Sequence, residues 1–126
     1  MEGEEACVDM VDELKIDKDC HVGEQWIRHY VCLIKSVCKK FGLRVLSIKK
    51  CSSKSKGIHF YIAIEPSIHA NLANQIQWLL GDDSNRVDFN RARIEVGLPD
   101  WNKLFEKVGA RLRTIYRAAN HEKTSM

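Results

Sequence analysis

The sequence predicts an α+β fold, with a small antiparallel sheet that is built around a basic β-hairpin and packed on one face by three to four helices. Three patterns lead to this prediction. Apolar residues recur at helical spacing over residues 23–41, apolar and polar residues alternate over residues 58–65, and a basic loop precedes that alternating segment. A chain of 126 residues fits one hydrophobic core, so residues 1–126 are expected to form a single domain.

The chain begins with an acidic segment. Residues 1–20 contain eight acidic residues and two lysines. Cys7, Met10 and Val11 follow a helical spacing, which predicts a short helix over about residues 1–13. Residues from Leu14 onward are expected to be extended. Such an acidic segment also suits contact with a basic protein partner.

The clearest helix is predicted for residues 23–41. Lys39 and Lys40 lie in its last turn, where they favour the negative end of the helix dipole. Gly42 then supplies a left-handed stop. One apolar stripe runs along the helix and consists of Trp26, Ile27, Tyr30, Val31, Ile34, Val37, Cys38 and Phe41.

A β-hairpin is predicted next, with strands at residues 44–50 and 58–65 and a loop at residues 51–57. In the second strand every even position is apolar, and these side chains are expected to face the helices. His59 and Tyr61 then point to the opposite, more open face of the sheet.

Two further segments follow the hairpin. Pro66 is expected to end the second strand, and Ser67 to cap a helix over residues 68–80. Residues 85–96 have a mixed pattern, which leaves a helix and a short strand with a turn both open.

A last helix is predicted for residues 101–119, because large apolar residues recur there at helical spacing, and a polar tail covers residues 121–126. Its other face is basic. Lys107, Arg111 and Arg113 are therefore candidates for tracking a phosphate backbone, with simple solubility as the alternative.

The cysteines and the hydropathy indicate a cytoplasmic, reducing environment. The five cysteines lack the spacings of a disulfide framework or a zinc site, so free thiols are expected. The first residues lack the features of a secretory signal, and no apolar run is long enough to span a bilayer. The sequence predicts no membrane contact.

The basic residues of the hairpin are candidates for binding nucleic acid. Between Lys35 and Gly57 the sequence has eight basic residues and no acidic one. Lysines bind phosphates, backbone N–H groups of a hydroxyl-rich loop can cradle an anion, and outward aromatic rings stack on bases. The alternative is an ordinary solvated hairpin. The candidate residues are Lys49, Lys50, Ser53, Lys54, Ser55, Lys56, His59 and Tyr61.

Acidic residues are candidates for a metal site. Asp17 and Asp19 lie two positions apart in an extended piece, so both carboxylates can reach one hard cation. Asp88 is a further carboxylate, close in sequence to Arg86 and Arg91. The alternatives are a generally acid-rich terminus and a surface helix with local ion pairs.

The order of these pieces carries more information than any one of them. An Asp-x-Asp pair precedes a helix that ends in Gly-Leu, and then come a strand, a Ser/Lys/Gly loop and a histidine at the start of the next strand. Over about residues 14–66 this order resembles the front half of the archaeo-eukaryotic primase (primase-polymerase) superfamily. The loop and His59 are similar to its second motif, whose histidine contacts nucleotide phosphates.

The resemblance implies a metal site for nucleotidyl transfer. Asp17, Asp19 and Asp88 would bind two Mg²⁺ or Mn²⁺ ions, which prefer oxygen ligands, and Arg91 would lie beside the triphosphate or the template. A relative that binds nucleic acid without polymerising is the other possibility that the resemblance offers.

Three functions follow as hypotheses. The preferred one is a small protein that binds single-stranded DNA or RNA, is related to primase-polymerases, and acts in replication or in a mobile element. The second is a metal-dependent nucleotidyltransferase with Mg or Mn as its cofactor. The third is an adaptor or inhibitor subunit that binds a protein partner through acidic residues 1–20.

Overall fold

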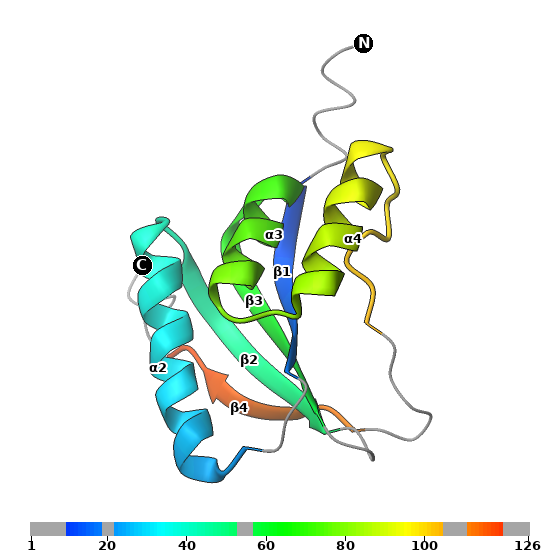
Figure 1. Cartoon of the computed structure of the whole chain (residues 1–126). Coiled ribbons are helices and arrows are strands. Elements are labelled where there is room, and N and C mark those ends of the chain that lie inside the picture. The colour runs from blue at the N-terminus through cyan, green and yellow to red at the C-terminus, as the bar shows by residue number, and fades with distance from the viewer. Residues whose placement is uncertain (1–9, 19–21, 53–56, 105–110, 120–126) are drawn as a thin grey trace.

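A computed structural model describes residues 10–18, 22–52, 57–104 and 111–119. The fold is α+β, with a four-stranded antiparallel sheet and three helices packed against it, which confirms the predicted class (Figure 1). The strand order is β1-β3-β2-β4. The elements are β1 (Met10–Lys18), α2 (Glu24–Lys40), β2 (Arg44–Ser52), β3 (Ile58–His69), α3 (Ala70–Leu79), α4 (Ser84–Glu95) and β4 (Arg113–Arg117).

Helix α2 and its end follow the prediction. The predicted stripe supplies the buried residues Ile27, Tyr30, Ile34 and Cys38. After the helix, the Leu43 and Gly42 N–H groups donate to the carbonyls of Cys38 and Lys39. This pattern needs a residue with positive φ, and Gly42 adopts a φ of 76° without the steric cost that other residues would meet.

The hydrophobic core lies between the helices and one face of the sheet. The apolar residues of β3 face the helices, as expected, with Phe60 and Ile62 fully buried. Leu14 pairs with Ile62 in the neighbouring strand, so its side chain lies on the same face and is fully buried too. The hydroxyl of Tyr30 donates to the Leu80 carbonyl over 2.5 Å. Burial, followed by the charge of Asp82, raises the pKa of Tyr30 and keeps that donor protonated.

The predicted end of the second hairpin strand is wrong. β3 continues through Pro66 to His69, and the side chain of His69, not of Ser67, caps α3 by accepting from the Asn71 N–H. Pro66 is tolerated because it lies beyond the last residue that pairs with β2 and in the irregular part of the pairing with β1. The missing N–H of proline therefore removes no regular ladder hydrogen bond.

Both predicted terminal helices are wrong within the described residues. Residues 10–13 belong to β1, residues 113–117 form β4, and residues 101–104 are a turn followed by irregular chain. The free edge of β2 offers unpaired backbone groups to residues 113–117, where β-branched Thr114 and Ile115 suit a strand. Residues 85–96, left open by the sequence, form most of helix α4.

The outer edge of β1 is covered by side chains. The Lys15 N–H donates to Gln77 Oε1 over 2.9 Å, and the Asp17 N–H donates to Asp82 Oδ1 over 2.9 Å. Arg86 donates from Nη2 to the Lys15 carbonyl over 2.8 Å. Polar side chains from α3, α4 and the turn between them thus satisfy the outward backbone groups of Lys15 and the outward N–H of Asp17.

These side chains also bind one another, and we call Gln77, Asp82, Arg86 and Asn102 the edge cluster. Arg86 Nε lies 3.2 Å from Asp82 Oδ1, and the amides of Gln77 and Asn102 exchange two hydrogen bonds. Gln77, Asp82 and Arg86 are at most 9% exposed. Burial raises the pKa of Asp82, while the Arg86 guanidinium acts in the opposite direction. The cluster is a buried ion pair whose hydrogen bonds are satisfied.

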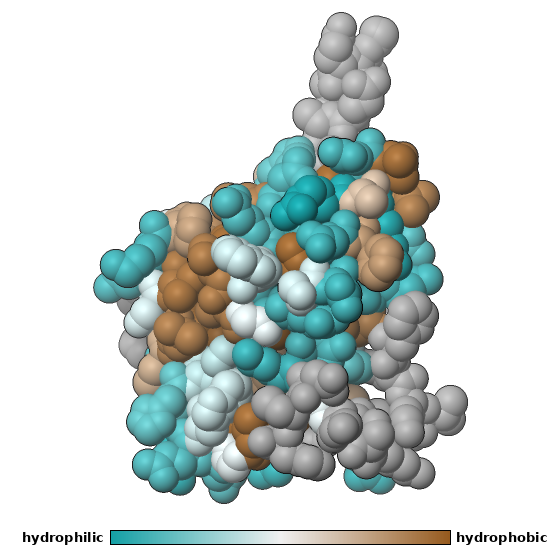
Figure 2. All heavy atoms as spheres, viewed as in Figure 1, coloured by the Kyte–Doolittle hydropathy of each residue, from teal (hydrophilic) through white to brown (hydrophobic). Residues whose placement is uncertain are grey.

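The helix side of the molecule carries an apolar area. Figure 2 shows hydrophobic atoms gathered between α2 and α3. Exposed apolar side chains on these two helices include Leu33, Trp78 and Leu79. No helix in the described ranges is long and apolar enough to cross a membrane.

Candidate nucleic-acid interface

The face of the sheet opposite the helices, which we call the outer face, holds a row of basic and aromatic side chains. Tyr61 in β3 pairs with Lys15 in β1 on one side and with Lys49 in β2 on the other. Thr114 of β4 extends the row beyond Lys49. Side chains of directly opposed residues lie on one face about 5 Å apart at Cβ, so a lysine side chain begins on each side of Tyr61.

These side chains are accessible to solvent. Lys15, Lys49 and Tyr61 are each partly exposed. Neither lysine makes an ion pair within the described part of the chain. Arg117, which is exposed, pairs with Ser47 one row further along the same face. The row therefore offers an aromatic surface with cations on both sides.

A second row on the outer face contains His59. Its neighbours are Asp17 in β1 and Cys51 in β2. His59 Nε2 lies 3.5 Å from Asp17 Oδ1, and only 11% of the His59 side chain is exposed. His59 thus lies on the face opposite the helices, as expected, but its side chain is largely buried there. Its imidazole is held beside the Asp17 carboxylate, where it can fix the position of that group.

The lysines of the predicted basic hairpin divide between two faces. Lys49 lies on the outer face, whereas Lys50 pairs with Phe60 and with Arg113, on the side that faces the helices. The structure thereby brings together Lys50 and Arg113, two of the predicted phosphate-binding residues. The remaining loop candidates, Ser53, Lys54, Ser55 and Lys56, lie outside the described residues, as does Lys107.

Two further predicted phosphate-binding residues, Arg91 and Arg111, lie outside these rows. Arg111 is exposed just before β4. Arg91 lies on α4, with Nη1 3.2 Å from Asp88 Oδ1 in a pair whose side chains are 62% and 71% exposed. Such exposed pairs contribute little to stability.

The predicted metal ligands are placed only in part. Asp17 lies in β1 beside His59, Asp88 lies on the exposed side of α4, and Asp19 lies outside the described residues. Among the residues that the structure describes, no three His, Cys, Asp or Glu side chains are grouped so that they could hold a metal ion.

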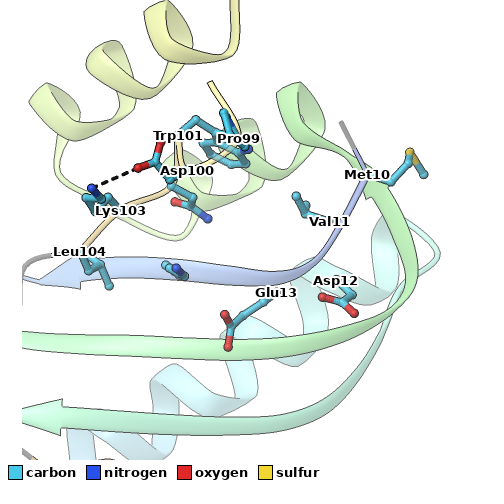
Figure 3. A pocket seen from close by; sticks show the side chains of 11 residues that line it. Met10, Val11, Asp12, Glu13, Pro99, Asp100, Trp101, Lys103 and Leu104 are labelled. Atoms are coloured by element: carbon cyan, nitrogen blue, oxygen red, sulfur yellow. Dashed lines mark ion pairs between the residues drawn. The ribbon is translucent and has the colours of Figure 1, made fainter. Parts of the chain in front are cut away.

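A cavity beside β1 has a different character. It has a volume of about 380 Å³ and lies between the start of β1 and residues 99–104 (Figure 3). Asp12 and Glu13 line it, together with Asp100 and Lys103, whose side chains form an exposed ion pair of 3.1 Å. The hydrogen bond and charge of Lys103 lower the pKa of Asp100. With this surplus of carboxylates the cavity does not suit a phosphate.

Sequence reasoning missed two residues of the interface. Lys15 alternates with the buried residues Leu14 and Ile16, and this signal could have placed it on the outer face. Arg117 was assigned to a helix, so its position on the sheet could not be inferred.

Comparison of the chain with protein-family models, with curated proteins and with solved structures finds no match. The resemblance to primase-polymerases stays a prediction from the sequence.

Proposed function

We propose that this protein binds single-stranded nucleic acid on the outer face of its sheet. The observation that carries the proposal is the row Lys15–Tyr61–Lys49, in which an aromatic ring lies between two cations from neighbouring strands. A base stacks on the ring whatever its identity, while the lysines bind the phosphates on either side. Arg117 adds a cation along the path of the strand.

Single strands fit this surface better than duplexes. Bases stack on Tyr61 only if they are unpaired and can turn away from their neighbours. The row also runs across the strands, which allows a polynucleotide to pass from β1 to β4 while it meets Lys15, Lys49 and Arg117. The binding is expected to show little sequence preference, since stacking and phosphate contacts distinguish bases weakly.

The test is fluorescence anisotropy with a labelled single-stranded oligonucleotide, as DNA and as RNA, over a range of salt concentrations. Tyr61→Leu keeps an apolar side chain but removes the ring, and it should weaken binding by about 10- to 100-fold, since stacking contributes about 1–3 kcal/mol per base. Lys49→Gln should also weaken binding, and it should make the negative slope of log affinity against log salt shallower by about 0.7.

Lys40→Gln is the matched control for charge, because Lys40 is exposed at the end of α2 and does not belong to the sheet. It should leave the affinity nearly unchanged. The proposal fails if the wild-type protein does not bind at low ionic strength, or if Tyr61→Leu and Lys49→Gln bind as the wild type does. Circular dichroism and denaturant unfolding of each variant show whether its fold is intact.

The nucleotidyltransferase hypothesis rests on Asp17, Asp19 and Asp88. The Asp17–His59 pair and the Asp88–Arg91 pair are what the structure adds to it. Neither of these contacts favours catalysis over binding, and nucleic-acid binding is therefore the function we propose.

A further inference from the structure

A second basic site lies on the helix side of β2 and β4. An open cavity of about 480 Å³ is lined by the first turns of α2, the end of β2 and the start of β4. Cavities that hold small organic ligands have volumes of about 300–1,000 Å³. This cavity is separate from the outer face, since its Lys50 points to the side of the sheet opposite Lys49.

Three cations line this cavity, each from a different element: Arg28 from α2, Lys50 from β2 and Arg113 from β4. Glu24 is the one carboxylate among the lining residues. None of these three cations has an ion pair or a side-chain hydrogen bond within the described ranges. The cavity therefore carries a surplus of positive charge that the described residues do not neutralise.

The pairing of two of these cations is unfavourable without a counter-charge. Lys50 and Arg113 are directly opposite each other in the β2–β4 register. Like charges at directly opposed positions of an antiparallel pair repel and destabilise the pairing. An anion bound between them would remove this repulsion and would accept hydrogen bonds from both side chains.

The other residues that line the cavity indicate the chemistry of the uncharged part of the ligand. Ile27 is buried, and Val31 and Ile115 are half-buried, so one side of the cavity is apolar. The carboxylate of Glu24 can bind hydroxyl groups. A fitting ligand has a doubly charged end for the cations and a compact body with both apolar and hydroxyl groups.

We propose that this cavity binds a phosphate monoester with a small, partly apolar organic body. Two sources share this chemistry, namely a free small molecule such as a nucleoside monophosphate and the phosphorylated end of a polynucleotide. The site does not depend on the proposed binding of single strands, because none of its cations belongs to the Lys15–Tyr61–Lys49 row.

Isothermal titration calorimetry with adenosine monophosphate, and with inorganic phosphate alone, tests the site. Lys50→Gln and Arg113→Gln should each weaken the binding of adenosine monophosphate at least about tenfold, in line with the loss of a charged hydrogen bond. Glu24→Gln should strengthen it, since it removes the one negative charge among the lining residues and keeps an oxygen that accepts from a hydroxyl group. Lys40→Gln should have no effect.

Two further measurements separate the sources and the two proposals. If a 5′-phosphorylated oligonucleotide binds more tightly than its unphosphorylated form, and Lys50→Gln abolishes the gain, the ligand is a strand end. If free adenosine monophosphate binds and the phosphorylated strand shows no gain, the ligand is a free small molecule. Tyr61→Leu should leave the binding of adenosine monophosphate unchanged.

The inference is overturned if neither phosphate nor adenosine monophosphate binds the wild type at millimolar concentration and low salt. It is equally overturned if binding is indifferent to Lys50→Gln and Arg113→Gln. Loss of folding is not a concern for Lys50→Gln, because the change relieves a like-charge pair. This variant should unfold at a denaturant concentration no lower than the wild type does.

Discussion

The two edges of the sheet are protected from pairing with another chain in different ways. At β1, Gln77, Asp82 and Arg86 bond to the outward backbone groups and are themselves buried. At the other edge, β4 has five residues, none of them buried, and an arginine at each end. An uncovered edge invites pairing with another chain, and covering it or keeping it short and charged are two remedies. The same sheet uses both.

The comparison explains where the last strand lies and what each edge does. Residues 113–117 pair with β2, whereas at the edge of β1 the outward groups of Lys15 and Asp17 already have side-chain partners from the edge cluster. The closed edge therefore contributes mainly to the stability of the fold. The open edge presents Arg113 and Arg117, and both proposed binding sites extend to it. Substitutions at the two edges should accordingly have different effects.

The largest effect is expected from Asp82→Ala at the closed edge. It leaves the buried Arg86 guanidinium without its carboxylate and the Asp17 N–H without its acceptor. Breaking a buried ion pair in this way costs about 3–5 kcal/mol of unfolding free energy. Denaturant unfolding measures it. Asp88→Ala, which breaks an exposed pair on the same helix as Arg86, should cost less than about 1 kcal/mol. Equal losses in the two variants would contradict the contrast.

A smaller effect is expected from Gln77→Leu. Its Oε1 accepts from the Lys15 N–H and from Asn102, so the change leaves two partly buried donors unpaired, at a cost of about 1–3 kcal/mol. The uncovered edge of β1 should also promote association, which light scattering detects. Gln75→Leu is the control, because Gln75 is exposed on the same helix. If Gln75→Leu associates equally, edge exposure is not the cause.

The smallest effect on stability is expected at the open edge, from Arg117→Glu. Arg117 is exposed, so the unfolding free energy should change by no more than about 0.5 kcal/mol. The salt dependence of oligonucleotide binding should nevertheless become weaker, as one phosphate contact is lost. A loss of stability as large as that of Gln77→Leu would show that the open edge also holds the fold together.

Local patterns in the sequence were enough to find the helix α2 and the β2–β3 hairpin. Apolar spacing over residues 23–41 and alternation over residues 58–65 are local patterns, and a glycine that can adopt positive φ, Gly42, marks the end of α2. β4 was missed because its five residues become a strand only when the edge of β2 is available, more than 60 residues away in the chain.

For the candidate site, the sequence predicted on which face of the sheet the side chains lie, but not how deeply they are buried. Alternation placed His59 and Tyr61 on the correct face, yet it could not show that His59 is buried beside Asp17, which comes from another strand. Gln77 and Arg86 could be read only as ordinary helix residues, because their partners lie on β1. Contacts between distant segments determine burial and pairing, and the local patterns of a single sequence do not reveal these contacts.

The strand order has a consequence for how the chain folds. β2 and β3 are neighbours in sequence and can pair early, whereas β1 must meet β3 across more than 40 residues, as the Asp17–His59 pairing shows. The contacts of Gln77 and Arg86 with Lys15 need β1 to be docked already. These contacts should therefore form after the rate-limiting step, so that they slow the unfolding of the native protein while hardly affecting how fast it forms.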